Sequence, residues 1–268
     1  MLLTARHLTI GYGDYIVQQD LTLDASAGSM ICMLGKNGCG KSTLLRTMAG
    51  LQPPLSGEIR IEAEGETTYQ IDAIDCHQRA KLLSLVLTER LSMDNTSVHD
   101  VVAMGRYPYS TFLGKLSAED EQHISTAMEQ TGIAEKSARF FNCLSDGEKQ
   151  RVLIAKALAQ QTPLILLDEP TAHLDLNNRI RILLLLRELA HKTKRCVVIS
   201  THELDLALQT ADTIWLMTPH QGSIKGGIET GTPEALTASG AFQNAFQDDS
   251  FSFLNDNGVL RIEITQCR

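Results

Sequence analysis

Short apolar runs separated by polar or glycine-rich turns recur along the chain, and each run predicts a β-strand. These runs cover residues 2–10, 17–23, 30–34, 58–61, 82–87, 164–167, 196–200 and 213–217. Segments with helical spacing of apolar residues lie between them and predict helices over 43–49, 74–80, 180–190 and 203–210. Because strands and helices alternate, we expect an α/β fold with a mainly parallel sheet that binds ligands at the carboxyl ends of its strands.

One long segment departs from this alternation. Between residues 88 and 159 the apolar spacing is helical, and it predicts helices over 98–104, 117–130 and 148–160. Ser117 and Asp120 have the spacing of a helix N-cap. We therefore expect 88–159 to be an inserted α-helical subdomain.

The remaining residues complete one domain over 1–268. The expected core consists of 1–87 and 160–217, and its first strands, with the alternating strand 58–61, predict an antiparallel β subdomain. Residues 218–268 predict a C-terminal extension. It contains a glycine turn at 226–227, a helix start at 231–234, and a hairpin whose turn is Asn257-Gly258.

Composition narrows the classes of function. The chain has 268 residues, a formal net charge of −8 and a pI near 5.5, which argues against a general nucleic-acid or anionic-membrane surface. Its six cysteines are scattered, without a CxxC pair, as is typical of a reducing cytoplasm. We expect no signal peptide and no membrane span, because the start is mixed in polarity and the apolar runs are short.

A glycine-rich turn between strand 30–34 and helix 43–49 carries the first chemical motif. Residues 35–42 read GKNGCGKS, which matches the phosphate-binding loop G-x-x-x-x-G-K-[ST]. Glycines let successive N–H groups converge on phosphate oxygens, and the helix N-terminus adds partial positive charge. Lys41 is expected at the β- and γ-phosphates of ATP and Ser42 at Mg²⁺. The predicted ATP-binding residues here are Gly35, Asn37, Gly38, Cys39, Gly40, Lys41, Ser42 and Thr43.

Cys39 is an unusual member of this loop because it carries a thiol. Its place near a helix N-terminus and Lys41 predicts a lowered pKa and a reactive thiolate. The alternative is that Cys39 is simply a small residue chosen for fit.

A second motif follows the apolar strand 164–167. Asp168 at the end of a buried strand can hold Mg²⁺, and the adjacent Glu169 can orient the attacking water. The alternative is a strand that ends in a solvated acidic turn. A third motif decides between these interpretations.

Residues 144–151 read LSDGEKQR and open the predicted helix upstream of that strand. This sequence resembles the signature of ATP-binding-cassette (ABC) ATPases, and five further motifs occur in the family's order between residues 12 and 202. Ser145 and Glu148 have capping-box spacing, so a plain capped helix is the structural alternative. The resemblance implies that Ser145, Gly147 and Glu148 face the γ-phosphate bound by a second copy of the chain, so that a homodimer forms two sites.

The same resemblance assigns the other motif residues. It implies that His202 contacts the γ-phosphate, that Asp175 belongs to the D-loop, and that Tyr12 stacks on adenine. The alternative for His202 is an exposed histidine at a strand end, and the alternative for Tyr12 is an ordinary turn tyrosine. Tyr15 is close enough to stack on adenine in place of Tyr12.

The sequence departs from the family at two positions. The family places a glutamine that contacts Mg²⁺ and the membrane partner after strand 82–87, where this chain has Thr88 and Glu89. Either Thr88 or Glu89 must replace the glutamine, or the contact with Mg²⁺ and the membrane partner is weakened. Thr88 is the predicted metal contact. Glu148 also stands where glutamine is commoner.

Within the family, the segments 105–109 (GRYPY) and 116–120 (LSAED) resemble those in the ATPase subunits of importers of iron chelates, haem and cobalamin. The resemblance implies an ATP-hydrolysing subunit at the cytoplasmic face of the plasma membrane, bound to two transmembrane permease subunits and indirectly to a substrate-binding protein. Tyr107 and Tyr109 are expected to dock on the permease, or else to pack on their own subdomain. The alternatives are an importer of another substrate class and a soluble ABC ATPase, although no second cassette or basic nucleic-acid surface is present.

Overall fold

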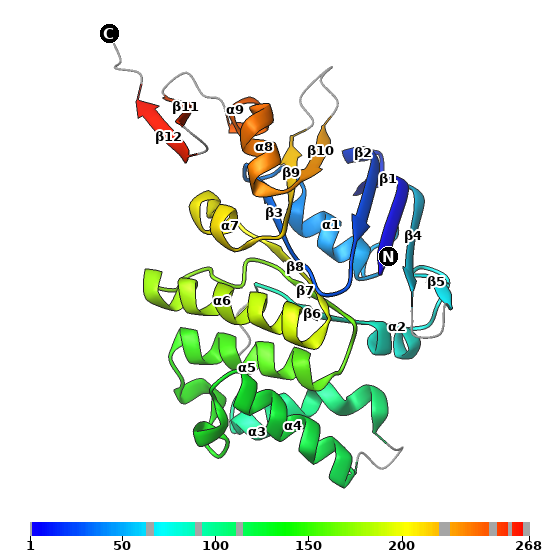
Figure 1. Cartoon of the computed structure of the whole chain (residues 1–268). Helices are drawn as coiled ribbons and strands as arrows, with labels where there is room; N and C mark the ends of the chain where they lie inside the picture. The colour runs from blue at the N-terminus through cyan, green and yellow to red at the C-terminus, as the bar shows by residue number, and fades with distance from the viewer. Residues whose placement is uncertain are drawn as a thin grey trace.

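The computed structural model describes residues 2–62, 67–88, 93–110, 115–219 and 226–246, and the backbone of 251–256 and 259–264. Strands and helices alternate around a central sheet, with a second sheet on one side and a group of helices on the other (Figure 1). The expected α/β fold is therefore confirmed. The division of the chain at residues 88, 160 and 218 stays a prediction.

The central sheet has the strand order β10-β9-β3-β8-β7-β6. Five of its strands run parallel, and β10 pairs antiparallel to β9. The strands are β3 (Met30–Gly35), β6 (Leu83–Val86), β7 (Leu164–Leu167), β8 (Cys196–Ser200), β9 (Thr213–Thr218) and β10 (Gly227–Gly231). All positions of β3, β7 and β8 are buried, which explains why the runs are apolar without alternation.

Each face of this sheet belongs to a different core. In β3, Met30, Cys32 and Leu34 lie in one cluster, while Ile31 and Met33 lie in the other, as the pleat requires. Helices α6 (Leu176–Thr193) and α7 (Leu204–Thr210) contribute to the first cluster, and α1 (Lys41–Met48) contributes to the second.

A four-stranded antiparallel sheet packs with α1 and confirms the expected β subdomain. Its order is β2-β1-β4-β5, and its strands are β1 (Leu3–Tyr12), β2 (Tyr15–Ala25), β4 (Ser56–Glu62) and β5 (Thr68–Gln70). The β1–β2 hairpin closes with Tyr12 opposite Tyr15. Helix α2 (Cys76–Leu82) then leads into β6.

The helical segment predicted from the sequence is present in the described residues. It contains α3 (Val98–Ala103), η1 (Met104–Tyr109), α4 (Ala118–Gln130), η2 (Ala134–Lys136), η3 (Phe141–Cys143) and α5 (Asp146–Ala159). The expected N-cap at Ser117 is confirmed as a capping box with Asp120. Ser145 and Glu148 form a second capping box, so that α5 begins at Asp146, two residues earlier than expected.

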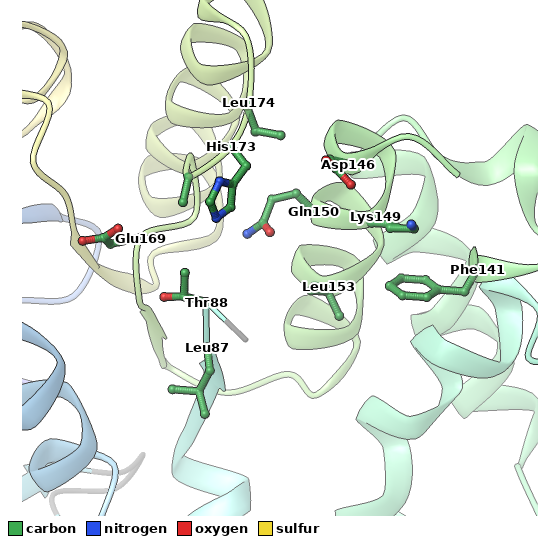
Figure 2. A pocket seen from close by; sticks show the side chains of 11 residues that line it. Leu87, Thr88, Phe141, Asp146, Lys149, Gln150, Leu153, Glu169, His173 and Leu174 are labelled. Carbon is green, nitrogen blue, oxygen red and sulfur yellow. The ribbon is translucent and has the colours of Figure 1, made fainter. Parts of the chain in front are cut away.

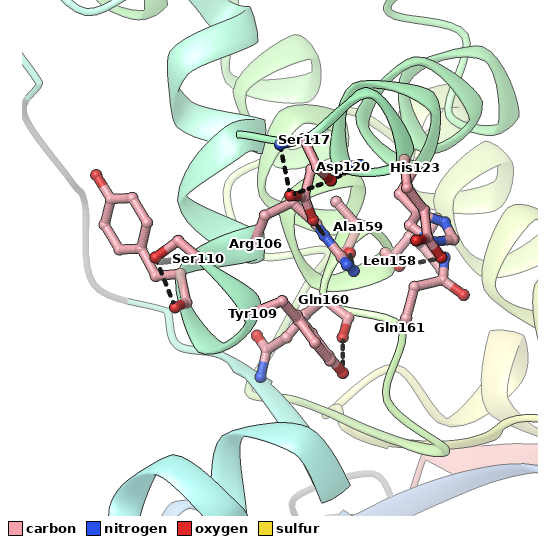
Figure 3. A network of polar contacts seen from close by, with 12 residues as sticks. Arg106, Tyr109, Ser110, Ser117, Asp120, His123, Leu158, Ala159, Gln160 and Gln161 are labelled. Atoms are coloured by element: carbon pink, nitrogen blue, oxygen red, sulfur yellow. Dashed lines mark hydrogen bonds and ion pairs between the residues drawn. The ribbon is translucent and has the colours of Figure 1, made fainter. Parts of the chain in front are cut away.

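A polar network joins η1 and α4 to the C-terminal end of α5 (Figure 3). Buried Arg106 donates to Asp120 Oδ1 at 2.8 Å and to the carbonyl of Ala159 at 2.7 Å. The ring of Tyr109 lies 4.1 Å from the Arg106 guanidinium carbon, and its hydroxyl donates to the carbonyl of Gln160 at 3.0 Å. The Gln160 amide in turn donates to two carbonyls at the junction of α2 and β6.

The C-terminal part agrees with the predictions except at β10. Thr232 caps α8 (Pro233–Ser239), α9 (Ala241–Phe246) follows, and β11 (Phe251–Asp256) pairs antiparallel with β12 (Val259–Ile264). The turn residues Asn257 and Gly258 lie outside the described residues. The sequence indicated a glycine turn at 226–227 but no strand after it, whereas in the structure Gly227 begins β10, which pairs with β9. Across the described ranges, every helix is too short or too polar to span a bilayer.

Candidate functional site

The glycine-rich loop joins β3 to α1 with its backbone open to an anion. Gly40 is the N-cap residue of α1, in the left-handed region at φ 106°, and no side chain caps the helix. A side chain at Gly35 would meet the carbonyl oxygen of Met217 at 2.6 Å, so only glycine fits there. No N-cap side chain therefore competes with an anion for the first N–H groups of α1, as a phosphate site requires.

Lys41 holds its ammonium group inside the curve of this loop. Its Nζ donates to the carbonyl of Gly35 at 2.8 Å and to that of Lys36 at 3.4 Å, and the residue is 7% exposed. Asn37 and Gly38 are exposed at the outside of the loop. The structure thus brings the predicted phosphate-binding residues together around one concentrated positive charge.

Ser42 and Asp168 meet although 126 positions separate them in sequence. The Ser42 hydroxyl donates to Asp168 Oδ1 at 3.1 Å, and Ser200 donates to the same oxygen at 2.6 Å. Asp168 is 6% exposed. A hydroxyl and a carboxylate are hard oxygen donors of the kind that Mg²⁺ prefers, so these residues fit the predicted metal site.

Glu169 follows directly and has an unusual backbone. Its φ is 45°, a left-handed conformation that costs a non-glycine residue of order 1 kcal/mol. Its N–H donates to the Ser200 hydroxyl at 2.8 Å, which fixes this conformation. The His202 Nδ1 lies 3.7 Å from Glu169 Oε2. The two predicted catalytic side chains are therefore neighbours at the carboxyl ends of β7 and β8.

Tyr12 reaches the phosphate loop from the β1–β2 hairpin. Its hydroxyl lies 3.1 Å from Thr43 Oγ1, while 52% of the residue stays exposed. Tyr15, opposite Tyr12 in the hairpin, is 70% exposed and lacks that contact among the described residues. The geometry thus favours Tyr12 over Tyr15 as the aromatic residue beside the nucleotide site.

Thr88 lies beside the acidic pair, in a pocket of about 140 Å³ between β6, α5 and the segment after β7 (Figure 2). Its hydroxyl donates to the backbone carbonyl of Asp168 at 2.9 Å. Figure 2 shows Gln150 and His173 on the opposite wall from Leu87. The hydroxyl oxygen of Thr88 keeps its lone pairs for a ligand. Glu89, the other candidate for the missing glutamine, lies outside the described residues.

The signature residues form the start of α5. The Glu148 carboxylate accepts from the Ser145 N–H at 2.9 Å and from the Lys136 ammonium group. These contacts, that of Lys136 first, lower the pKa of Glu148 to about 2. Glu148 therefore stays ionised at any physiological pH and locks the helix start.

The D-loop residue Asp175 touches this helix start through Asn178. Asp175 is the N-cap of α6 and accepts from the Asn178 backbone at 2.9 Å and from its side-chain amide at 2.8 Å. A side chain added at Gly147 would meet Asn178 at 3.2 Å. Gly147 thus allows α5 and α6 to approach each other closely.

The two halves of the predicted ATP site lie apart within one chain. Figure 1 shows α5 beside α3 and α4, below α6, whereas α1 lies beside the antiparallel sheet. A single copy therefore presents the phosphate loop on one part of its surface and the signature on another.

The expectation of a reactive thiolate at Cys39 was wrong. Cys39 is 1% exposed, and burial raises the pKa of its thiol more strongly than Lys41 lowers it. The helix start and the lysine are present as expected, but desolvation of the thiolate outweighs both. Cys39 follows the alternative interpretation, a small residue chosen for fit.

Two residues of the site escaped the sequence reasoning. Ser200 received no role, although its strand pairs in parallel with β7 and so places it beside Asp168. Gln18, fully buried against the phosphate loop, looked like an ordinary polar position of an alternating strand.

Comparisons with known proteins agree with this geometry. The family model described as ABC transporter matches residues 18–172. The petrobactin import ATP-binding protein of Bacillus anthracis is 36% identical over 234 residues, which are 87% of this chain and 84% of that protein. The iron(3+)-hydroxamate import ATP-binding protein of Bacillus subtilis is 34% identical over 92% of this chain and 88% of its own length.

A solved structure is similar over nearly its whole length. It is described as a metal-chelate type ABC transporter in an inward-facing conformation, and it aligns with a TM-score of 0.78 at 27% identity. The alignment covers 98% of this chain and 96% of that one.

Proposed function

The chain belongs to the ABC transporter family of ATP-binding proteins, and from this premise we propose that it is the energy-coupling subunit of an importer of iron chelates, haem or cobalamin. Members of this family hydrolyse ATP to drive transport. The observation that carries the proposal is the contact of Ser42 with Asp168 beside the phosphate loop, with Glu169 held next to them through Ser200. The similarity to petrobactin and hydroxamate import proteins supports the substrate class.

In this proposal the phosphate loop and Lys41 bind the phosphates of ATP. Ser42, Asp168 and the oxygen of Thr88 hold Mg²⁺, which when bound neutralises charge on the phosphate oxygens. Glu169 orients the attacking water, and His202 contacts the γ-phosphate from the neighbouring strand end. Tyr12 holds adenine against the β1–β2 hairpin.

A second copy completes each site. Ser145, Gly147 and Glu148 start a capped helix whose backbone N–H groups suit an anion. Their helix α5 packs with α3 and α4, whereas α1 packs with β1 and β3, and this arrangement supports a homodimer in which each signature faces the partner's loop. ATP closes the dimer and hydrolysis reopens it.

The proposed membrane partners are two permease subunits, which place the chain at the cytoplasmic face of the plasma membrane, with a substrate-binding protein beyond them. Tyr107 is 63% exposed and is the candidate docking aromatic. Tyr109 instead packs on its own subdomain, because its ring lies against Arg106 and its hydroxyl donates to the carbonyl of Gln160.

The test is reconstitution of the chain with the permease encoded beside its gene in proteoliposomes that enclose Mg²⁺ and ATP. We expect uptake of a ferric siderophore, haem or cobalamin from its binding protein, together with ATP hydrolysis, and neither with Glu169→Gln. ATP hydrolysis without uptake of any of these chelates would contradict the substrate class. Absence of a permease that co-purifies with the chain would favour a soluble ABC ATPase.

A further inference from the structure

Gln18 is a buried amide that bridges two segments around the phosphate loop. It lies in β2 and is 0% exposed. Its Nε2 donates to the carbonyl of Cys39 at 2.8 Å and to the carbonyl of Thr218, the last residue of β9, at 2.7 Å. The antiparallel sheet, the phosphate loop and the central sheet therefore meet at one side chain.

The chemistry of these contacts fixes the orientation of the amide. Both partners are carbonyl oxygens, which only accept, so the nitrogen and not the oxygen of Gln18 must face them. Both of its N–H groups are used. Gln18 Oε1 is left buried and has no hydrogen-bond partner among the described residues.

A buried amide with one unsatisfied oxygen costs stability, on the order of 1–3 kcal/mol. A leucine or methionine of similar size would avoid that cost but would leave the carbonyls of Cys39 and Thr218 without this donor. The position therefore calls for an explanation beyond packing, and the Cys39 carbonyl supplies one.

The Cys39–Gly40 peptide is trans, so its carbonyl and the N–H of Gly40 point in opposite directions. Gln18 holds the carbonyl on the protein side of the loop. The N–H of Gly40 consequently points away from Gln18, toward the open side of the loop at the start of α1. Rotation of this peptide would instead present a carbonyl oxygen, which repels phosphate.

We propose that Gln18 is a positioning residue for ATP: it anchors the Cys39–Gly40 peptide so that the Gly40 N–H is oriented toward phosphate before the nucleotide arrives. Gln18 does not touch ATP. The inference rests on ATP binding by the phosphate loop, and so on the proposed function.

The test compares Gln18→Met with Gln160→Met. Gln160 is a matched control, because its Nε2 also donates to two backbone carbonyls, those of Ala80 and Leu83, but at the junction of α2 and β6 and not in the phosphate loop. For Gln18→Met we expect an about tenfold rise in the Kd and KM for ATP, the effect of one buried hydrogen bond, with kcat at saturation unchanged. Gln160→Met should lower the melting temperature without changing the Kd.

Equal ATP affinity of wild type and Gln18→Met would overturn the inference, while failure of the wild type to bind ATP would overturn the proposed function instead. An equal loss of ATP affinity in Gln18→Met and Gln160→Met would show a general effect of destabilisation and would also overturn the inference.

If Gln18→Met does not fold, NMR relaxation of the nucleotide-free wild type decides. We expect the backbone of residues 39 and 40 to be rigid before ATP is added, with order parameters of about 0.85, because the Cys39 carbonyl is anchored. Order parameters below about 0.6 at these residues would contradict the proposal.

Discussion

The hydroxyl of Ser200 lies 2.6 Å from Oδ1 of Asp168 and accepts the N–H of Glu169 from the next peptide. One side chain therefore orients the proposed metal ligand Asp168 and holds the left-handed backbone of Glu169, the proposed catalytic base. Because Ser200 is 0% exposed, no water can readily take its place.

Ser200→Ala should lower kcat about tenfold while the Kd for ATP stays within twofold, because a buried hydrogen bond is lost from the hydrolytic residues and not from the phosphate loop. Steady-state ATPase assays and nucleotide titration separate these effects. Ser200→Thr, which keeps the hydroxyl, is the control and should recover part of the activity. An unchanged kcat in Ser200→Ala would rule out this role.

Glu169→Gln should bind ATP normally and lose at least about 100-fold in turnover, because it keeps the shape of the side chain but removes the base. With Mg²⁺ and ATP the variant should accumulate as a dimer, measured by size-exclusion chromatography with light scattering. Near-normal turnover would mean that another residue orients the water.

Lys41→Ala should weaken ATP binding about 10- to 100-fold, since it removes a charge-assisted contact with the phosphates. Nucleotide titration followed by fluorescence measures the loss. Lys36→Ala, on the exposed side of the same loop, is the matched control and should cost far less. Equal affinities for Lys41→Ala and wild type would show that the loop does not bind phosphate as proposed.

Cys39 should resist maleimide in the folded protein at pH 7, because its raised thiol pKa and its burial leave almost no accessible thiolate. The exposed Cys76 and Cys143 are internal controls and should react readily. Mass spectrometry of the labelled peptides, with and without urea, measures each site. If maleimide labelled Cys39 in the folded protein as fast as it labels Cys76, this prediction would be wrong.

Asp120→Asn should destabilise the chain by about 3 kcal/mol at pH 7, because it breaks a buried ion pair with Arg106. Backbone and side-chain hydrogen bonds from Ser117, with Arg106, lower the pKa of Asp120 to about 2 from its ordinary 3.8. The carboxylate thus stabilises the fold fully above pH of about 4, and this contribution is lost as the pH falls toward 2. Urea unfolding at pH 7, 5 and 3.5 should show the gap between variant and wild type narrowing only at the lowest pH.

Local chemistry explains what the sequence could predict. The strand before Gly35, the helix after Lys41 and the cap at Ser145 each depend on neighbouring residues, so the pattern alone indicates them. The acid at the end of β7 needs only an apolar run before Asp168. These features locate the phosphate loop, the acidic pair and the signature without knowledge of the tertiary contacts.

The features that were missed depend on contacts between distant segments. Gln18 resembles a solvent-facing residue until β9 and the phosphate loop cover it. Burial reverses the expected pKa shift of Cys39, and no neighbouring residue in the sequence reports that burial. The sequence of β10 does not have the apolar pattern of a strand, and the segment becomes one only through its pairing with β9.

The network around Arg106 and Gln160 fixes the C-terminal end of α5, so that a rotation of the helix about this end is amplified at its N-terminal end. Its C-terminal end is bound to the core by the side-chain amide of Gln160, while its other end carries Ser145 and Gly147 beside α6. Fourteen residues of helix make an arm about 21 Å long. A rotation of about 10° around the bound end would displace the signature by about 4 Å, roughly the length of one peptide unit. A small rearrangement beside β6 would thereby move the signature by about one peptide unit and leave the phosphate loop itself unchanged.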